Sequence, residues 1–148
     1  YSAYTLTLEV LLYLFIAGCS MYLLAKYLGF SRQLSFALAC MYMCSGFFTG
    51  SVQYINFITA AAFIPAAWLC LLRLIHTPCM RHAFTLSLAW YMILAGGHPA
   101  IPIAFAYCTL VFTVVLLVLN KSYRERMRQI LLYLLVATGL LLLFYLLL

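Results

Sequence analysis

The sequence contains no aspartate and only two glutamates, Glu9 and Glu125, and charged residues make up 7% of it. An ordinary soluble domain is about a quarter charged and about half apolar, whereas this chain is 69% hydrophobic. A soluble core of this size has no room for that much apolar surface. The composition therefore excludes an ordinary soluble domain and favours lipid as the solvent for much of the surface.

Several catalytic signatures are also missing from the sequence. It has no Walker loop, Rossmann fingerprint, HExxH helix or serine nucleophile elbow. No lysine lies deep in an apolar run, which argues against a retinal-type Schiff base. Haem or quinone carriers would need paired histidines within facing helices, which His98 alone does not supply. No cofactor is therefore evident.

A metal site has little support. His76, Cys79 and His82 have the spacing of metal ligands, but Pro78 interrupts any helical turn there and no fourth ligand is evident. The neighbouring arginines would repel a cation. We predict no metal at these residues, and no residues here support a divalent cation as cofactor.

Long apolar runs fill the rest of the sequence. A membrane-crossing helix needs about 20 mostly apolar residues. Such runs predict an all-α, polytopic transmembrane helix bundle, in which one helical domain occupies residues 1–148. About six spans are expected, near residues 6–25, 34–50, 57–75, 83–95, 101–119 and 130–148.

The basic residues fix an orientation for these spans. All eight lysines and arginines fall within 26–32, 73–81 and 121–128, while the links 50–56 and 96–100 carry no charged side chain. Because positive loops stay in the cytoplasm, we predict cytoplasmic basic loops and place residue 1 outside. The protein is then a multi-pass protein of the bacterial inner membrane. The basic residues set the topology and contact the surface of the lipid bilayer. No nucleic acid is therefore expected as a partner.

The chain begins at Tyr1 and ends within the apolar run 140–148. We expect it to be a fragment of a longer protein, and we expect membrane protein partners beside it.

Two features predict how the helices pack. Gly46 and Gly50 form a G-x-x-x-G pair, which favours close contact between helices. Alanines at 60–62 and 66–67 give the third span a surface of small side chains that favours the same kind of packing. Pro65 removes the backbone hydrogen bond to the Ala61 carbonyl. In lipid, a neighbouring helix must supply a partner for that carbonyl.

Glu9 is the only acid within an expected span. It lies roughly 24 Å along the helix from the inner end, near the outer interface. One interpretation is an outward-facing carboxylate that binds a cation, a sugar hydroxyl or a basic residue. The other is an interfacial glutamate wetted by headgroup water.

The two uncharged links hold the remaining candidates. Gln53, Tyr54 and Asn56 would either hydrogen-bond a polyol substrate or cap helix ends. In the other link, Gly96 and Gly97 allow positive φ and Pro99 favours an extended His98. His98 is then either a donor to a phosphate or a proton carrier, or an interfacial residue of a tight turn.

An ordered set of motifs resembles the YfhO family of bacterial multi-pass membrane proteins, which are related to the GT-C glycosyltransferases. These motifs are YMCSGFF at 42–48, QYIN at 53–56, AAAFIP at 60–65 and AGGHP at 95–99, with AG at 17–18, YLLA at 22–25 and LG at 28–29 upstream. The similarity covers roughly residues 8–105.

The resemblance implies transfer of a sugar from a polyprenyl-phosphate-linked donor to a cell-envelope acceptor on the outer face of the membrane. The catalytic acid of such enzymes lies in the first outer loop, which this sequence does not contain, so the catalytic residue stays unknown. Only His98, with Gln53 and Asn56, carries over as a residue that contacts the donor; Tyr54 departs from the family pattern. Glu9 joins them because it faces the same side.

Two other functions stay open. In a transporter or flippase subunit, Pro65, the turn around His98 and Glu9 would form a gated pathway. In a non-catalytic membrane scaffold, the helices would pack through Gly46, Gly50 and the alanines, and replacing His98 or Glu9 would leave function intact.

Overall fold

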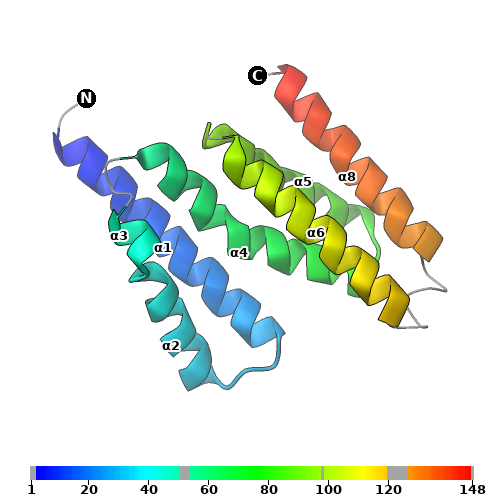
Figure 1. Ribbon diagram of the computed structural model, residues 1–148, viewed down its shortest axis with the longest axis horizontal. Helices are drawn as coiled ribbons and strands as arrows, with labels where there is room; N and C mark the ends of the chain where they lie inside the picture. Colours follow the sequence, from blue (N-terminus) through cyan, green and yellow to red (C-terminus); the bar gives the residue numbers. More distant parts are fainter. Residues whose placement is uncertain (1–2, 51–53, 98, 120–126, 148) are drawn as a thin grey trace.

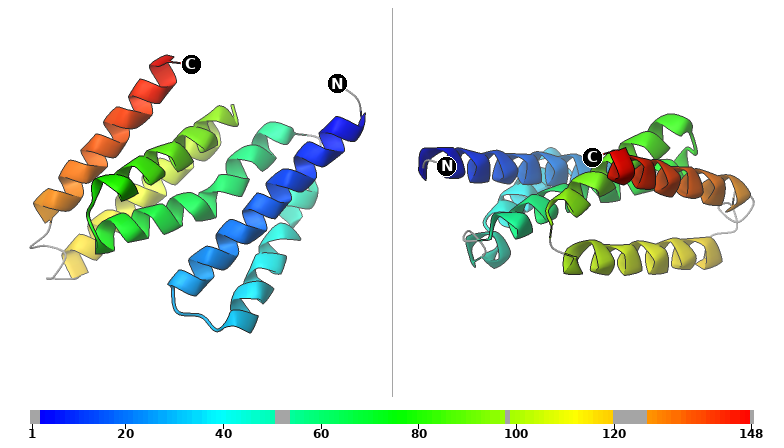
Figure 2. Two further views of the ribbon diagram at one scale, coloured as in Figure 1. Left: turned by 180° about the vertical axis from the view of Figure 1, so that it is seen from behind. Right: turned by 90° about the horizontal axis from the view of Figure 1, so that it is seen from above.

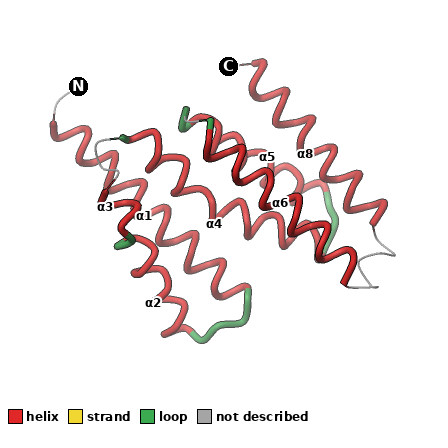
Figure 3. Tube along the Cα trace, viewed as in Figure 1, coloured by secondary structure: helices red, strands yellow, loops and turns green. Residues whose placement is uncertain are grey.

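A computed structural model describes residues 3–50, 54–97, 99–119 and 127–147. Every regular element in these ranges is a helix, and they contain no strand (Figure 3). The helices are α1 (Ala3–Tyr27), α2 (Arg32–Met43), α3 (Gly46–Gly50), α4 (Ile55–His76), α5 (Met80–Ala95), α6 (Ala100–Leu119) and α8 (Met127–Leu147). The predicted all-α class is thus confirmed for the part of the chain that is described.

The helices run back and forth between two ends of the molecule (Figure 1). Helix α4 lies centrally and packs against α1 on one side and α5 on the other. Helix α2 covers α1, and α8 packs on α5. Helix α6 forms a separate layer over α4 and α5, as Figure 2 shows from above. The last turns of α1, α4 and α6 and the first turns of α2, α5 and α8 lie at one end, and the first turns of α4 and α6 and the last turn of α5 lie at the other.

Local sequence signals explain the turn between α1 and α2. Gly29 has φ +89°, a conformation that favours glycine. The Phe30 N–H donates to the Ala25 carbonyl and the Gly29 N–H donates to Lys26, which is a Schellman closure of α1. Ser31 then caps α2, because its side chain accepts a hydrogen bond from the Leu34 N–H.

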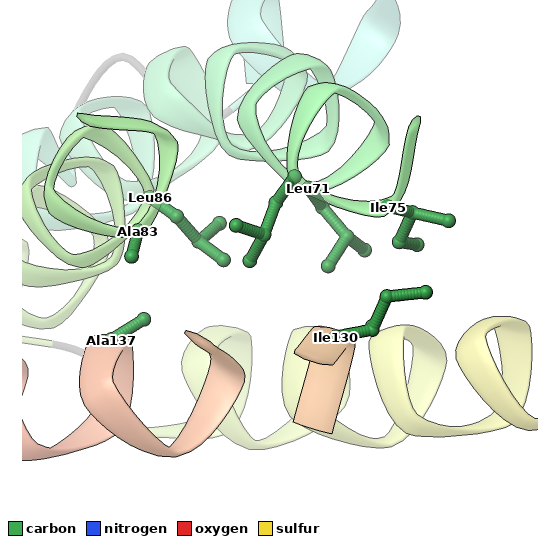
Figure 4. Packing of buried hydrophobic residues seen from close by; sticks show 7 residues of the cluster. Leu71, Ile75, Ala83, Leu86, Ile130 and Ala137 are labelled. Atoms are coloured by element: carbon green, nitrogen blue, oxygen red, sulfur yellow. The ribbon is translucent and has the colours of Figure 1, made fainter. Parts of the chain in front are cut away.

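The apolar core consists of three clusters along α4. Its first half meets α1 and α3 around Ala17, Phe48 and Ile58. Its alanines meet α5 and α6 around Ile93 and Phe105. Its second half packs with α5 and α8, where Ile130 and Ala137 of α8 face the residues of the two other helices (Figure 4).

Two of the described helices, α1 from Tyr4 and α4, are long and apolar enough to cross a membrane by length and composition. Two further apolar helical stretches, Ala100–Leu116 of α6 and Arg128–Leu143 of α8, are shorter. A single helix was expected over residues 34–50, but the structure divides it into α2 and α3.

Candidate functional site

The carbonyl that Pro65 leaves without its helical partner has a donor from another helix. The Tyr42 hydroxyl of α2 donates to the Ala61 oxygen at 2.9 Å. Next to it, the buried Ser20 hydroxyl of α1 lies 3.0 Å from the Ala17 oxygen of its own helix and 3.3 Å from the Ala62 oxygen of α4. The prediction that a neighbouring helix covers the Ala61 carbonyl is therefore confirmed. The Tyr42 hydroxyl joins α2 to α4 at the level of the proline, and Ser20 places a second hydroxyl of α1 against the same turn.

The sequence did not identify Tyr42 and Ser20 as these donors. The signal was present, because a proline inside an apolar helix demands a donor from elsewhere. However, many hydroxyls lie on the preceding helices. Choosing between them required the register of α1 and α2 against α4, which sequence periodicity does not supply.

The break between α2 and α3 falls at Cys44 and Ser45. The Ser45 N–H bonds to the Tyr42 carbonyl, three residues back, and the Ser45 carbonyl accepts hydrogen bonds from Phe48 and Thr49 to begin α3. Phe48 then lies 2% exposed in the cluster with α1 and α4. The break thereby lets α3 bring an aromatic side chain back onto the bundle.

The G-x-x-x-G interpretation of Gly46 and Gly50 was wrong for the described residues. A methyl group added at either glycine would meet nothing within 4 Å. Both lie on the short α3, which packs against α1 and α4 through Phe48 and not through its glycines. The alanine surface of α4 does pack against neighbouring helices, because Ala60, Ala62 and Ala67 are fully buried.

A groove of about 440 Å³ lies between α2–α3, α4 and α6. Ser45 and Phe47 line it from the broken helix, Ile64 and Trp68 from α4, and Ala104 and Cys108 from α6. Its walls are almost wholly apolar, and the hydroxyl of Tyr42, which also lines it, is already bonded to Ala61. Such a surface suits an apolar chain rather than a sugar.

The first turn of α4 meets the glycine turn that follows α5 at one end of the bundle. A methyl group on Gly96 would lie 2.9 Å from both the Asn56 carbonyl oxygen and the Ala60 Cβ, so only glycine fits there without a shift. Gly97 has φ +76°, and its added methyl would be 3.7 Å from the Asn56 amide nitrogen. The exposed Asn56 thus lies beside the glycine turn that precedes His98.

Glu9 lies toward the same end. Helices α1 and α4 run in the same direction (Figure 1). Ser20 of α1 lies at the level of Ala62 of α4, so positions along the two helices can be compared from there. Glu9 precedes Ser20 by eleven residues, whereas Ile55, the first residue of α4, precedes Ala62 by seven. At about 1.5 Å per residue, Glu9 lies roughly 6 Å beyond the start of α4 along the bundle. It is half-buried, and no hydrogen bond or ion pair joins it to residues in the described ranges.

The other two candidates, Gln53 and His98, lie outside the described residues. The structure therefore brings Asn56 to the glycine turn and places Glu9 at the same end. Within the ranges that are described, no three histidine, cysteine or acidic side chains gather as metal ligands would.

Comparison with known proteins gives no relative. No family model, no curated protein and no solved structure matches the chain.

Proposed function

We propose that this chain is the membrane-embedded part of a polytopic protein of the bacterial inner membrane. The apolar surface that faces outward supports the membrane location. Five large apolar side chains on it are each between 65% and 76% exposed: Leu8, Phe15, Tyr107, Val118 and Leu135. Only 22% of the apolar window of α1 is buried. A helix that is apolar all round, yet mostly uncovered, needs lipid or further helices around it.

The proposed orientation places the basic loops in the cytoplasm and the start of α1 outside. Lys26, Arg32, Arg73 and Arg81 all flank the links at one end of the bundle, and Arg128 begins α8 there (Figure 1). Asn56 and Gly96 lie at the opposite end. This separation of charge supports the positive-inside orientation.

For the activity, we propose glycosyl transfer of the YfhO and GT-C kind. A sugar would move from a polyprenyl-phosphate-linked donor to a cell-envelope acceptor on the outer face. The observation that carries this proposal is the position of the apolar groove. It is lined by α3, by Ala61, Ile64 and Trp68 in the middle of α4, and by the first half of α6. Helix α3 and the start of α6 lie toward the uncharged end, so the groove extends from the middle of the bundle to that end.

A polyprenyl chain in this groove would hold its phosphate near Asn56 and the glycine turn. Asn56 and Glu9 are the described residues proposed to meet the donor, and Gln53 and His98 remain predictions from the sequence. We assign no catalytic acid among these residues.

Photo-crosslinking tests the groove. A photoactivatable polyprenyl phosphate should label α3 and α6, and Ala104→Trp should abolish this labelling because the indole fills the groove. Ala37→Trp is the matched control: Ala37 is an exposed alanine of α2 outside the groove. Equal labelling of both variants would contradict the proposed lipid site.

The transfer itself is tested in cells. A deletion strain should lose a sugar from an envelope polymer, and the intact gene should restore it. Unchanged glycans would refute the glycosyltransferase.

The broken helix α2–α3 favours a second candidate, a transporter or flippase subunit. Purified protein in vesicles separates the two candidates. A flippase would move the lipid-linked donor across the bilayer without transferring its sugar.

A further inference from the structure

We propose that the basic end of the bundle carries a specific binding site for the phosphate of an acidic membrane lipid, formed by Lys26, Tyr27, Arg73 and His76. We call these four residues the basic cluster. The inference rests on the proposed membrane location, but it concerns the end opposite the groove and does not depend on sugar transfer.

Aromatic contacts hold the cluster together. The Arg73 guanidinium carbon lies 5.7 Å from the centre of the Tyr27 ring, within the range of a cation–π contact. The rings of Tyr27 and His76 meet edge to face, with centroids 5.9 Å apart. One aromatic side chain of α1 therefore positions two basic side chains of α4.

The charges of Lys26 and Arg73 are exposed, and no ion pair joins either side chain to an acid in the described residues. Lys26, Arg73 and His76 are all exposed, and Lys26 lies in the last turn of α1 beside Tyr27. Glu9, the acid among the described residues, is near the other end of α1. Lys26 and Arg73 also stand in the last turns of α1 and α4, where they offset the helix dipoles.

A lipid phosphate suits this arrangement better than a soluble anion. The cluster joins two helix ends that directly adjoin apolar surface, including the exposed Leu23 and Leu28. An acidic phospholipid would place its phosphate beside Lys26 and Arg73. Its acyl chains would lie along that apolar surface. Each lysine or arginine near an anionic membrane surface contributes about 1 kcal/mol.

The test uses the full chain in detergent, titrated with short-chain phosphatidylglycerol. Arg73→Ala and Lys26→Ala should each weaken binding about fivefold. Arg128→Ala removes the same charge from α8, outside the basic cluster, and should change binding by less than about twofold. Tyr27→Leu should weaken binding although every charge remains, while Tyr27→Phe should retain it because the ring is kept.

Several outcomes would overturn the site. An equal loss in Arg128→Ala would show diffuse attraction, and equal binding of phosphatidylcholine would show no preference for acidic lipids. Displacement of the lipid by inorganic phosphate alone would show a simple anion site. Because this titration measures no sugar transfer, a failure of the proposed enzyme would leave the lipid result unaffected, and the reverse also holds.

Discussion

At the scale of single residues, Pro65 and its partners explain how α4 joins its neighbours. A proline within a helix leaves one carbonyl without a donor, and Tyr42 supplies the donor from α2. The sequence was sufficient to predict that a donor was needed. It was insufficient to identify Tyr42, because the hydroxyl that reaches Ala61 depends on the register of two packed helices.

A double-mutant cycle tests this pairing. Tyr42→Phe should destabilise the protein by about 1 kcal/mol, because the Ala61 carbonyl loses its partner while the ring still packs. In Pro65→Ala, the restored backbone N–H serves that carbonyl, so the added cost of Tyr42→Phe should nearly vanish. Unfolding in detergent would measure each step.

Tyr107→Phe is the control for that cycle, since Tyr107 is 69% exposed on α6. It should leave stability unchanged in both backgrounds. If Tyr42→Phe costs the same with and without Pro65, the hydroxyl does not serve the proline carbonyl.

At the scale of elements, the apolar runs predicted where helices lie, but not where one of them breaks. The run over 34–50 is apolar on both sides of Cys44 and Ser45, so composition gave no sign of two helices. The structure shows that the break lets Phe48 pack against α1 and α4. In the same way, G-x-x-x-G spacing could not reveal that α3 has no close neighbour at its glycines.

Helix α6 is attached mainly through aromatic side chains. The Trp68 ring of α4 meets Phe112 at 4.9 Å and Phe105 at 5.7 Å, and Trp90 of α5 meets Phe105 at 5.0 Å. These contacts hold the layer that forms one wall of the groove.

Trp68→Leu should therefore loosen α6 selectively. We expect hydrogen exchange to rise along α6, while α1, which Trp68 does not hold in place, keeps its protection. The loss of an edge-to-face aromatic pair costs about 0.5–1.5 kcal/mol beyond the buried area. A uniform rise over the whole bundle, or no rise in α6, would contradict this role for Trp68.

At the scale of the whole molecule, the two ends differ in chemistry. One end carries the described lysine and arginines at the helix termini, and the other brings Asn56 to the glycine turn, with Glu9 nearby. The sequence predicted this separation, because it follows from the order of charged and uncharged links alone. It could not predict the groove, whose walls come from three segments far apart in the chain.

Cysteine labelling in intact cells tests the membrane location and orientation most directly. All six cysteines would be replaced by alanine, and one would then be restored at Cys79 or introduced as Ala100→Cys. A maleimide that cannot cross membranes should label Ala100→Cys at once, and Cys79 only after the cells are permeabilised. Immediate labelling at both positions, or the reverse order, would contradict a bundle that crosses the membrane with its basic end in the cytoplasm.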